Sequence, residues 1–147
     1  MKSKNLLLVA VLFAVNCFSQ STKIEDKKGI HYITNAIDYP ITGTYLYQGT
    51  EPVVELNAGG SGFYQSHEQP KRAMNWGIEC DETGAPKFIK GFDNAAYTLW
   101  YKYTTKSDLG DDDDTNWKAV EFTIHFNTLK MFIQGERSKD YTETAGK

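Results

Sequence analysis

Apolar and polar residues alternate along much of the chain after residue 20, and the alternation is clearest near the C-terminus. The apolar members of this stretch are Val120, Phe122, Ile124, Phe126, Leu129, Met131 and Ile133, with a break at residues 127–128. Side chains that share one face of a β-strand recur at every second residue. A turn at the break therefore predicts a hairpin that pairs Ile124 with Met131 and Phe122 with Ile133 on one buried face.

Three other stretches predict strands with one apolar face. The residues expected on those faces are Tyr45 and Tyr47 in residues 42–48, Met74, Trp76, Ile78 and Cys80 in residues 73–80, and Tyr97, Leu99, Tyr101 and Tyr103 in residues 96–104. Residues 53–56 and 63–64 flank a glycine-rich segment, which predicts a second hairpin because glycine tolerates the positive φ of tight turns. Residues 87–92 are a further, less regular strand in this interpretation.

The predicted strands are short, lie about ten residues apart and are joined by turns. Such spacing predicts an all-β fold, namely an antiparallel up-and-down β-barrel of about eight strands, with a β-sandwich as the alternative. Residues 20–29 are polar, and we expect them to form a loose part of an N-terminal lead-in over residues 20–39. The barrel domain is expected to occupy residues 40–147.

The start of the chain has a different pattern, which predicts an export signal. Lys2 and Lys4 precede an unbroken apolar run at residues 6–15, and small residues follow it. Ten residues span about 15 Å as a helix, half of the hydrocarbon thickness of a membrane. The run is therefore typical of a signal peptide, here over residues 1–19, and is too short for a membrane anchor.

Export decides the compartment in which the mature chain is expected. Cleavage after Ser19 leaves a chain that begins at Gln20 and is periplasmic or extracellular, with no transmembrane span. Lipid attachment at Cys17 is the alternative, although Asn16 is a poor residue to precede a lipidated cysteine.

The composition excludes several classes of function. Loss of residues 1–19 removes two lysines, so the mature chain has 16 − 2 = 14 basic and 19 acidic residues, a balance of −5. This charge argues against a nucleic-acid partner, because binding phosphates requires a basic surface. One cysteine, Cys80, remains, and its apolar neighbours predict a buried thiol and not a nucleophile. We expect a monomer without a cofactor.

Residues with catalytic or metal-binding chemistry are scattered along the chain. His31, His67 and His125 show no metal-pair spacing, and we expect them at the surface. Four consecutive aspartates offer Asp111 and Asp113 as candidate calcium ligands, but such a run of like charges is more typical of a solvated loop. No nucleophile elbow is present. We therefore expect neither a catalytic residue nor a metal site, and no enzyme activity.

Several features of the chain occur together in one family of small barrels. Gly43, Thr44 and Tyr45 open the first strand, residues 56–64 combine a strand, a glycine-rich turn and two aromatic residues, and Arg137 follows the last long strand. Over residues 40–141 this arrangement resembles the lipocalin-like (calycin) proteins secreted by bacteria, with Tyr45 in place of the family's tryptophan. The resemblance implies an up-and-down barrel, closed by a cation–π contact between Arg137 and Tyr45, that often holds a small apolar ligand.

The inward-facing side chains are the candidate ligand-binding residues. They line a pocket if the barrel is hollow and are simply core if it is filled. The candidates are Tyr45, Tyr47, Val54, Leu56, Trp76, Ile78, Leu99, Tyr101, Phe122, Ile124, Met131 and Ile133. Trp100 and Phe132 lie on the polar faces of their strands and are candidate contact points for a partner.

Two functions of different classes remain open. The first is non-enzymatic binding of a small apolar or amphipathic ligand inside an exported barrel. The alternative is a secreted β-sandwich or barrel module that binds a protein or a glycan through its outer face. A hollow interior favours the first function, whereas a filled interior with an exposed apolar patch favours the second.

Overall fold

The computed structural model describes residues 20–47, 50–65, 70–106, 115–127, 130–133 and 136–137, with the backbone alone at residues 46–47, 50–53, 130–131 and 136–137. The regular elements in these residues are strands, apart from one short 3-10 turn, η1 (Ala58–Gly60). The strands are β1 (Thr22–Asp26), β2 (Gly29–Thr34), β3 (Gly43–Tyr47), β4 (Thr50–Leu56), β5 (Ser61–Tyr64), β6 (Arg72–Cys80), β7 (Phe88–Lys90), β8 (Asn94–Tyr103), β9 (Lys118–His125), β10 (Lys130–Ile133) and β11 (Glu136–Arg137).

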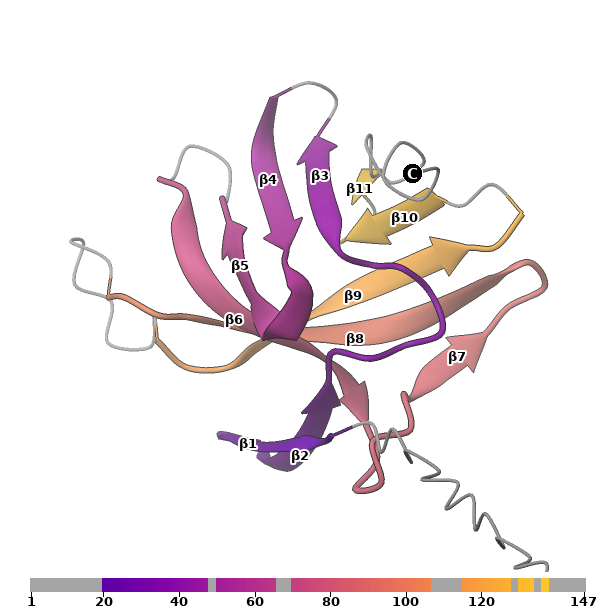
Figure 1. Cartoon of the computed structure of the whole chain (residues 1–147), viewed down its shortest axis with the longest axis horizontal. Helices are drawn as coiled ribbons and strands as arrows, with labels where there is room; N and C mark the ends of the chain where they lie inside the picture. The colour runs from indigo at the N-terminus through magenta and orange to yellow at the C-terminus, as the bar shows by residue number, and fades with distance from the viewer. Residues whose placement is uncertain are drawn as a thin grey trace, which may run out of the picture.

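The strands form one curled antiparallel sheet (Figure 1). Its main path runs β3–β4–β5–β6–β8–β9–β10–β11, while β1, β2 and β7 join it as side branches. The first and last strands of the path, β3 and β11, approach within 8 Å between Cα atoms. The predicted all-β, antiparallel fold is confirmed, and the sheet is a half-barrel in shape.

Two predicted hairpins have the expected partners. In β9–β10 the register pairs Met131 with Ile124 and Ile133 with Phe122. In β4–β5 the turn is η1, and Leu56 pairs with Gly62. A Cβ atom on Gly62 would lie 2.1 Å from the Glu55 carbonyl oxygen, so this close strand pairing requires glycine.

One apolar cluster covers the inner face of the sheet. Its buried members include Trp76 and Ile78 of β6 and Phe122 and Ile124 of β9. The connection between β2 and β3, residues 35–42, crosses in front of the sheet (Figure 1). It contributes Ile41, which is 2% exposed, while Ile37 and Tyr39 pack against the same cluster. This segment, which we call the strap, covers part of the inner face with the chain's own side chains.

The expectation that residues 20–29 form a loose lead-in is wrong. Residues 22–26 form β1, which pairs with β2 from Thr22↔Ile33 to Asp26↔Gly29. The hairpin contributes Ile24 and Ile33 to a second buried cluster on the outer face, together with Trp100 of β8. The polar residues of this segment are compatible with a strand because Ile24 is the one buried side chain of β1, and the other four are half-buried or exposed.

Trp100 is therefore not the exposed contact point that the alternation predicts. The alternation places its side chain on the outer face, as the structure does. It is nevertheless only 4% exposed, because the β1–β2 hairpin covers it. The hairpin lies close to the sheet because Gly77 of β6 has no side chain at this point. A Cβ atom there would lie 2.8 Å from Cβ and Cδ1 of Ile33.

We predict that Gly77→Val destabilises the fold by about 1–3 kcal/mol, because the added atoms overpack the outer cluster. Urea unfolding followed by tryptophan fluorescence measures the change. Asn75→Val is the matched control, because Asn75 is exposed on the same face of the same strand. Equal stability of the two variants would contradict the close approach of Ile33 to Gly77.

Candidate functional site

The outer face is most distinctive where two strands share one edge of β8. β6 pairs with β8 as far as Ile78↔Leu99, and β7 takes over at Phe88↔Tyr97. Between them, residues 79–87 leave the edge as a small hairpin, in which Lys87 N–H donates to the Glu79 carbonyl at 2.9 Å. β2 pairs with the end of β6, where this hairpin begins, at Tyr32↔Cys80 and Ile33↔Glu79.

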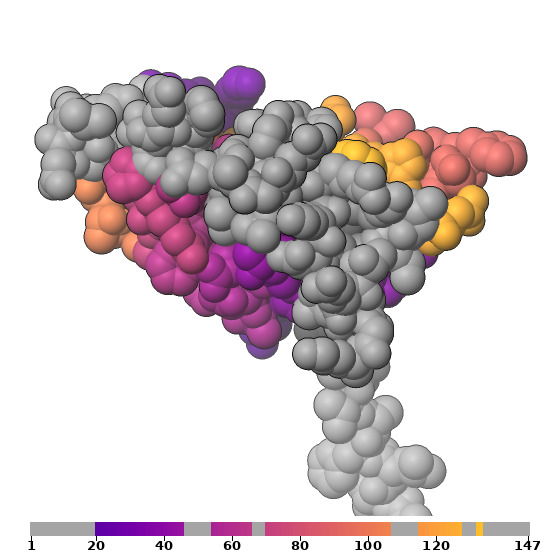
Figure 2. Space-filling view, turned by 90° about the horizontal axis from the view of Figure 1, so that it is seen from above, coloured from indigo at the N-terminus to yellow at the C-terminus, as the bar shows by residue number. Residues whose placement is uncertain are grey.

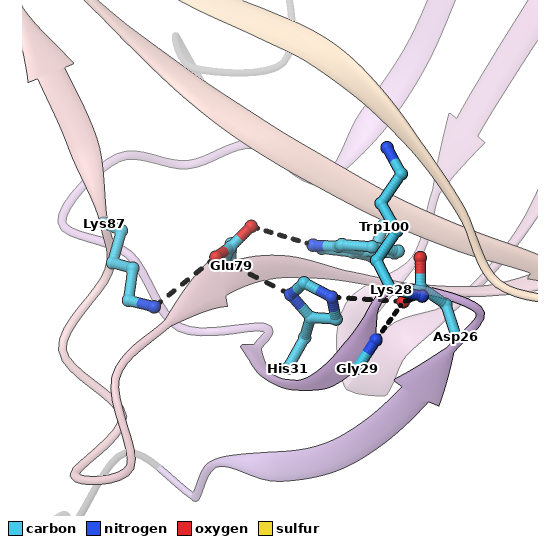
Figure 3. A network of polar contacts seen from close by, with 7 residues as sticks. All are labelled: Asp26, Lys28, Gly29, His31, Glu79, Lys87 and Trp100. Carbon is cyan, nitrogen blue, oxygen red and sulfur yellow. Dashed lines mark hydrogen bonds and ion pairs between the residues drawn. The ribbon is translucent and has the colours of Figure 1, made fainter.

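Glu79 is the centre of a polar network at this branch (Figure 3). Its Oε2 accepts a hydrogen bond from Trp100 Nε1 at 3.1 Å, and its Oε1 lies 3.4 Å from Lys87 Nζ. His31 Nδ1 of β2 lies 3.9 Å from the same Oε1. One carboxylate thus connects β6, β8, β2 and the residue that precedes β7.

A second carboxylate, that of Asp26, holds the other side of His31 (Figure 3). His31 Nε2 lies 3.3 Å from Asp26 Oδ1, and the imidazole packs on the Trp100 ring with centroids 4.4 Å apart. Burial by itself would raise the pKa of Asp26. The backbone N–H groups of Lys28 and Gly29, together with His31, outweigh this effect and lower the pKa below its ordinary value of 3.8.

The network fastens the β1–β2 hairpin to the sheet and does not resemble a catalytic array. Its carboxylates and imidazole bind one another, the Trp100 indole and backbone amides, and no serine, threonine or cysteine hydroxyl or thiol in it could act as a nucleophile. His31 is half-buried and not at the surface as predicted, with 23% of its side chain exposed. His125 is also half-buried and packs edge-on against Phe132 with centroids 5.0 Å apart.

A groove of about 420 Å³ lies beside this network on the outer face. Small residues on β8 and β9, among them Ala96, Thr98 and Ala119, line its bottom. Ile89, Glu121 and the Glu79–Lys87 ion pair line it as well. A second hollow, of about 450 Å³, lies between residues 25–28 of the β1–β2 turn and residues 116–118.

Large apolar side chains are exposed next to the groove. Phe88 and Ile89 of β7 are 53% and 78% exposed, and Phe92 at the following turn is fully exposed. We call these three residues the β7 patch. The turn that carries Phe92 projects from one edge of the molecule, at the right of both views (Figures 1 and 2). Ile30 is the other large apolar residue exposed in the described part of the chain, at 54%.

The predicted pocket residues come together on the inner face. Those with described side chains all belong to the inner cluster, and each is less than 9% exposed: Tyr45, Val54, Leu56, Trp76, Ile78, Leu99, Tyr101, Phe122, Ile124 and Ile133. Two of their polar atoms bind the chain itself, since Trp76 Nε1 donates to the Ser61 carbonyl at 2.7 Å and the Tyr45 hydroxyl donates to the Ile41 carbonyl. Neither of the two hollows above opens onto the centre of this cluster.

Several predicted residues fall outside what the structure describes. The side chains of Tyr47, Met131 and Arg137 are among them, so the predicted contact between Arg137 and Tyr45 stays a prediction. Asp111 and Asp113 lie outside the described residues altogether, as does His67. Within the described ranges, no group of three or more His, Cys, Asp or Glu side chains could hold a metal ion. No helix in the described part is long and apolar enough to cross a membrane.

The β7 patch is the surface feature that the sequence interpretation missed. The sequence predicts a strand over residues 87–92, and β7 lies within this range. Phe88 and Ile89 are adjacent, so their side chains point to opposite faces of the sheet. If only one face of β7 is covered, one of the two side chains therefore stays exposed. Two neighbouring large apolar residues in a short strand between lysines are the signal that could have identified the patch.

Comparison with known proteins found no counterpart. A scan of protein-family models, a search of curated proteins and a search of solved structures each returned no match to this chain.

The lowered pKa of Asp26 predicts a pH-dependent part of the stability. A carboxylate whose pKa is lower in the folded state stabilises the fold above its unfolded pKa, near 3.8, and loses this effect as the pH falls through the folded value. Wild type should therefore exceed Asp26→Asn in urea midpoint at pH 6, and the gap should close between pH 4 and pH 2. Glu25→Gln controls for the change in net charge. A gap that persists at pH 2 would contradict the prediction.

Cys80 should not react with thiol reagents in the folded protein. It is fully buried, and burial raises its pKa, with Asp81 and Glu79 adding to the increase. With a chain that starts at Gln20, we expect no reaction with a chromogenic disulfide reagent at pH 8 and complete reaction in guanidinium chloride. Rapid labelling of the native chain would show that the branch near Glu79 opens readily.

Proposed function

We propose that the chain is a non-enzymatic binding module that contacts a partner protein through the β7 patch and the adjoining groove. The observation that carries the proposal is the grouping of exposed apolar side chains. Phe88, Ile89 and Phe92 lie within five consecutive residues of one strand and its turn, with Phe88 and Ile89 on opposite faces of β7. A partner that contacts both faces of this strand would bury all three side chains, and burial of apolar surface would stabilise the complex.

The surroundings of the patch support this proposal. Polar side chains border the apolar ones: Glu121 and the Glu79–Lys87 pair line the groove, and the exposed Lys90 follows Ile89 in β7. An apolar centre with a polar rim is the usual arrangement of a protein–protein interface. The inner face offers less support for a ligand, because the strap packs on it and the polar atoms of Trp76 and Tyr45 bind backbone carbonyls.

A second candidate is the binding of a small apolar or amphipathic ligand within a lipocalin-like barrel. The curled sheet and the single inner cluster are compatible with it. Tyr64, Tyr101 and Tyr103 also gather at one end of the inner face, with the rings of Tyr64 and Tyr101 5.1 Å apart. Native mass spectrometry of the chain from its source tests this candidate. A bound mass that is lost on denaturation would favour the ligand over the surface partner.

Either function would operate outside the cytoplasm in this proposal, because residues 1–19 have the pattern of a signal peptide. The N-terminal sequence of the mature protein tests export directly. A start at Gln20 supports cleavage, whereas a lipid-modified Cys17 would place the module at a membrane surface.

Site-specific photo-crosslinking tests the proposed surface. We expect p-benzoylphenylalanine in place of Phe92 to form a discrete protein adduct in the source cells. The same probe in place of Ile30 should form none, because Ile30 is an isolated exposed apolar residue. Adding Ile89→Asn should reduce the adduct at position 92 roughly tenfold, as expected for a central interface residue.

Two outcomes would contradict the proposal. Equal adducts at positions 30 and 92 would show that the probe reports exposure and not a specific partner. An absence of adducts at both positions, together with a bound small molecule in the native mass spectrum, would favour the second candidate.

A further inference from the structure

We infer that the partner binds by adding an extended strand to the free edge of β7, and that this strand places a carboxylate opposite Lys90 and an aliphatic side chain opposite Ile89. The inference deepens the proposed function and rests on it. It concerns the backbone of β7, whereas the proposed function concerns the side chains of the β7 patch, so each can fail separately.

One edge of β7 is unpaired in the described part of the structure. β7 binds β8 on one side, at Phe88↔Tyr97, Ile89↔Ala96 and Lys90↔Ala95. No described strand pairs with its other side. An unpaired strand edge is a template for another strand.

The hydrogen-bond pattern identifies which backbone groups are available. Gly91 N–H donates to the Asn94 carbonyl at 2.8 Å, which makes this pair a hydrogen-bonded pair of the β7–β8 ladder. Such pairs alternate with non-bonded pairs in antiparallel sheets, so Ile89 bonds to Ala96. The N–H and C=O groups of Phe88 and Lys90 therefore point to the open edge.

The side chains around this edge define the chemistry of the added strand. Ile89 is exposed beside the groove, so an aliphatic residue opposite it would bury apolar surface on both strands. Lys90 is exposed and has no ion pair with the described residues, so a carboxylate directly opposite it would give a favourable cross-strand pair. Lys87, in contrast, is already paired with Glu79.

The same lysine argues against a second copy of this chain as the partner. Antiparallel self-pairing with the available groups would be centred on Ile89 and would place each Lys90 opposite the Phe88 of the other copy. Both ammonium groups would then lie on one short edge without a carboxylate opposite them. Lysines on an edge strand are a common means of preventing self-association. A partner strand with a carboxylate opposite Lys90 would pair with this ammonium group, so Lys90 would favour an acidic partner over a second copy of the chain.

A designed peptide tests the inference on the chain that starts at Gln20. The probe is acetyl-Thr-Glu-Val-Leu-Thr-amide, and the matched probe carries Lys in place of Glu. We expect NMR titration with the first peptide to slow hydrogen exchange of the Phe88 and Lys90 amides, and not those of β1, the other side branch with one partner. The Glu peptide should bind roughly two- to fivefold more tightly than the Lys peptide at low salt.

Two variants separate backbone pairing from side-chain contact. Lys90→Pro removes an N–H that the β7–β8 ladder does not use, so the melting temperature should be kept while peptide binding is lost. Lys90→Glu keeps the N–H and should reverse the preference between the two peptides. The second variant remains informative if the first does not fold.

The outcomes distinguish strand addition at β7 from the proposed surface function. Peptide binding that survives in folded Lys90→Pro, or that leaves the Phe88 and Lys90 amides of the wild type unprotected, would overturn strand addition, while the proposed surface function would stand. An absence of peptide binding at millimolar concentration, or unchanged preference in Lys90→Glu, would also overturn it. Concentration-dependent dimerisation of the free chain through β7, detected by sedimentation, would show that a second copy takes this edge. An absence of adducts at position 92 in cells is the separate failure of the proposed function.

Discussion

The length of β8 constrains the rest of the structure. β8 has ten residues, and on the edge away from β9 no single neighbour covers its length, so β6 pairs with one part of this edge and β7 with another. The chain between them must leave the sheet and return, which produces the hairpin of residues 79–87. β2 pairs with residues 78–80 of β6 on the edge away from β8, beyond the end of β5, and Glu79 lies beside Trp100. The groove and the exposed β7 strand lie at the same junction, so the surface that we propose for binding is a consequence of how the sheet is built.

Apolar side chains lie on both faces of the sheet and must be shielded from water on each. Different segments of the chain shield the two faces. The inner face is covered by curling of the sheet and by the strap of residues 35–42. The outer face is covered over Gly77 and Trp100 by the β1–β2 hairpin, which the carboxylates of Asp26 and Glu79 hold through His31. The part of the outer face near β7 has no such cover in the described structure. Phe88, Ile89 and Phe92, three of the four large apolar side chains exposed in the described residues, lie next to this uncovered part.

Local alternation was enough to predict the inner face, but not which outward positions are buried. The β9–β10 register follows from Phe122, Ile124, Met131 and Ile133, because a slip of one residue would bury polar side chains. Trp100 was placed on the correct face, yet its burial depends on Ile33, which is distant in sequence. The strap has apolar residues at alternate positions without being a strand, and β7 is too short for a period to be recognised. The candidate site is a product of these non-local contacts, so the sequence indicated a strand there but not an exposed surface.

The pairing of β2 with β6 also has a consequence for the order in which the molecule can assemble. β1 and β2 are adjacent in sequence and can meet early, but the surface that buries Ile24 and Ile33 comes from β6 and β8. Pairing β2 with β6 closes a long loop of chain, which costs conformational entropy. Burial of side chains offsets this entropy only after much of the sheet has formed. The strap then has to pass from the outer hairpin around to the inner face before β3 begins. We therefore expect the first strands of the chain to be among the last to become buried during folding, and Trp100 to stay open to solvent until they dock.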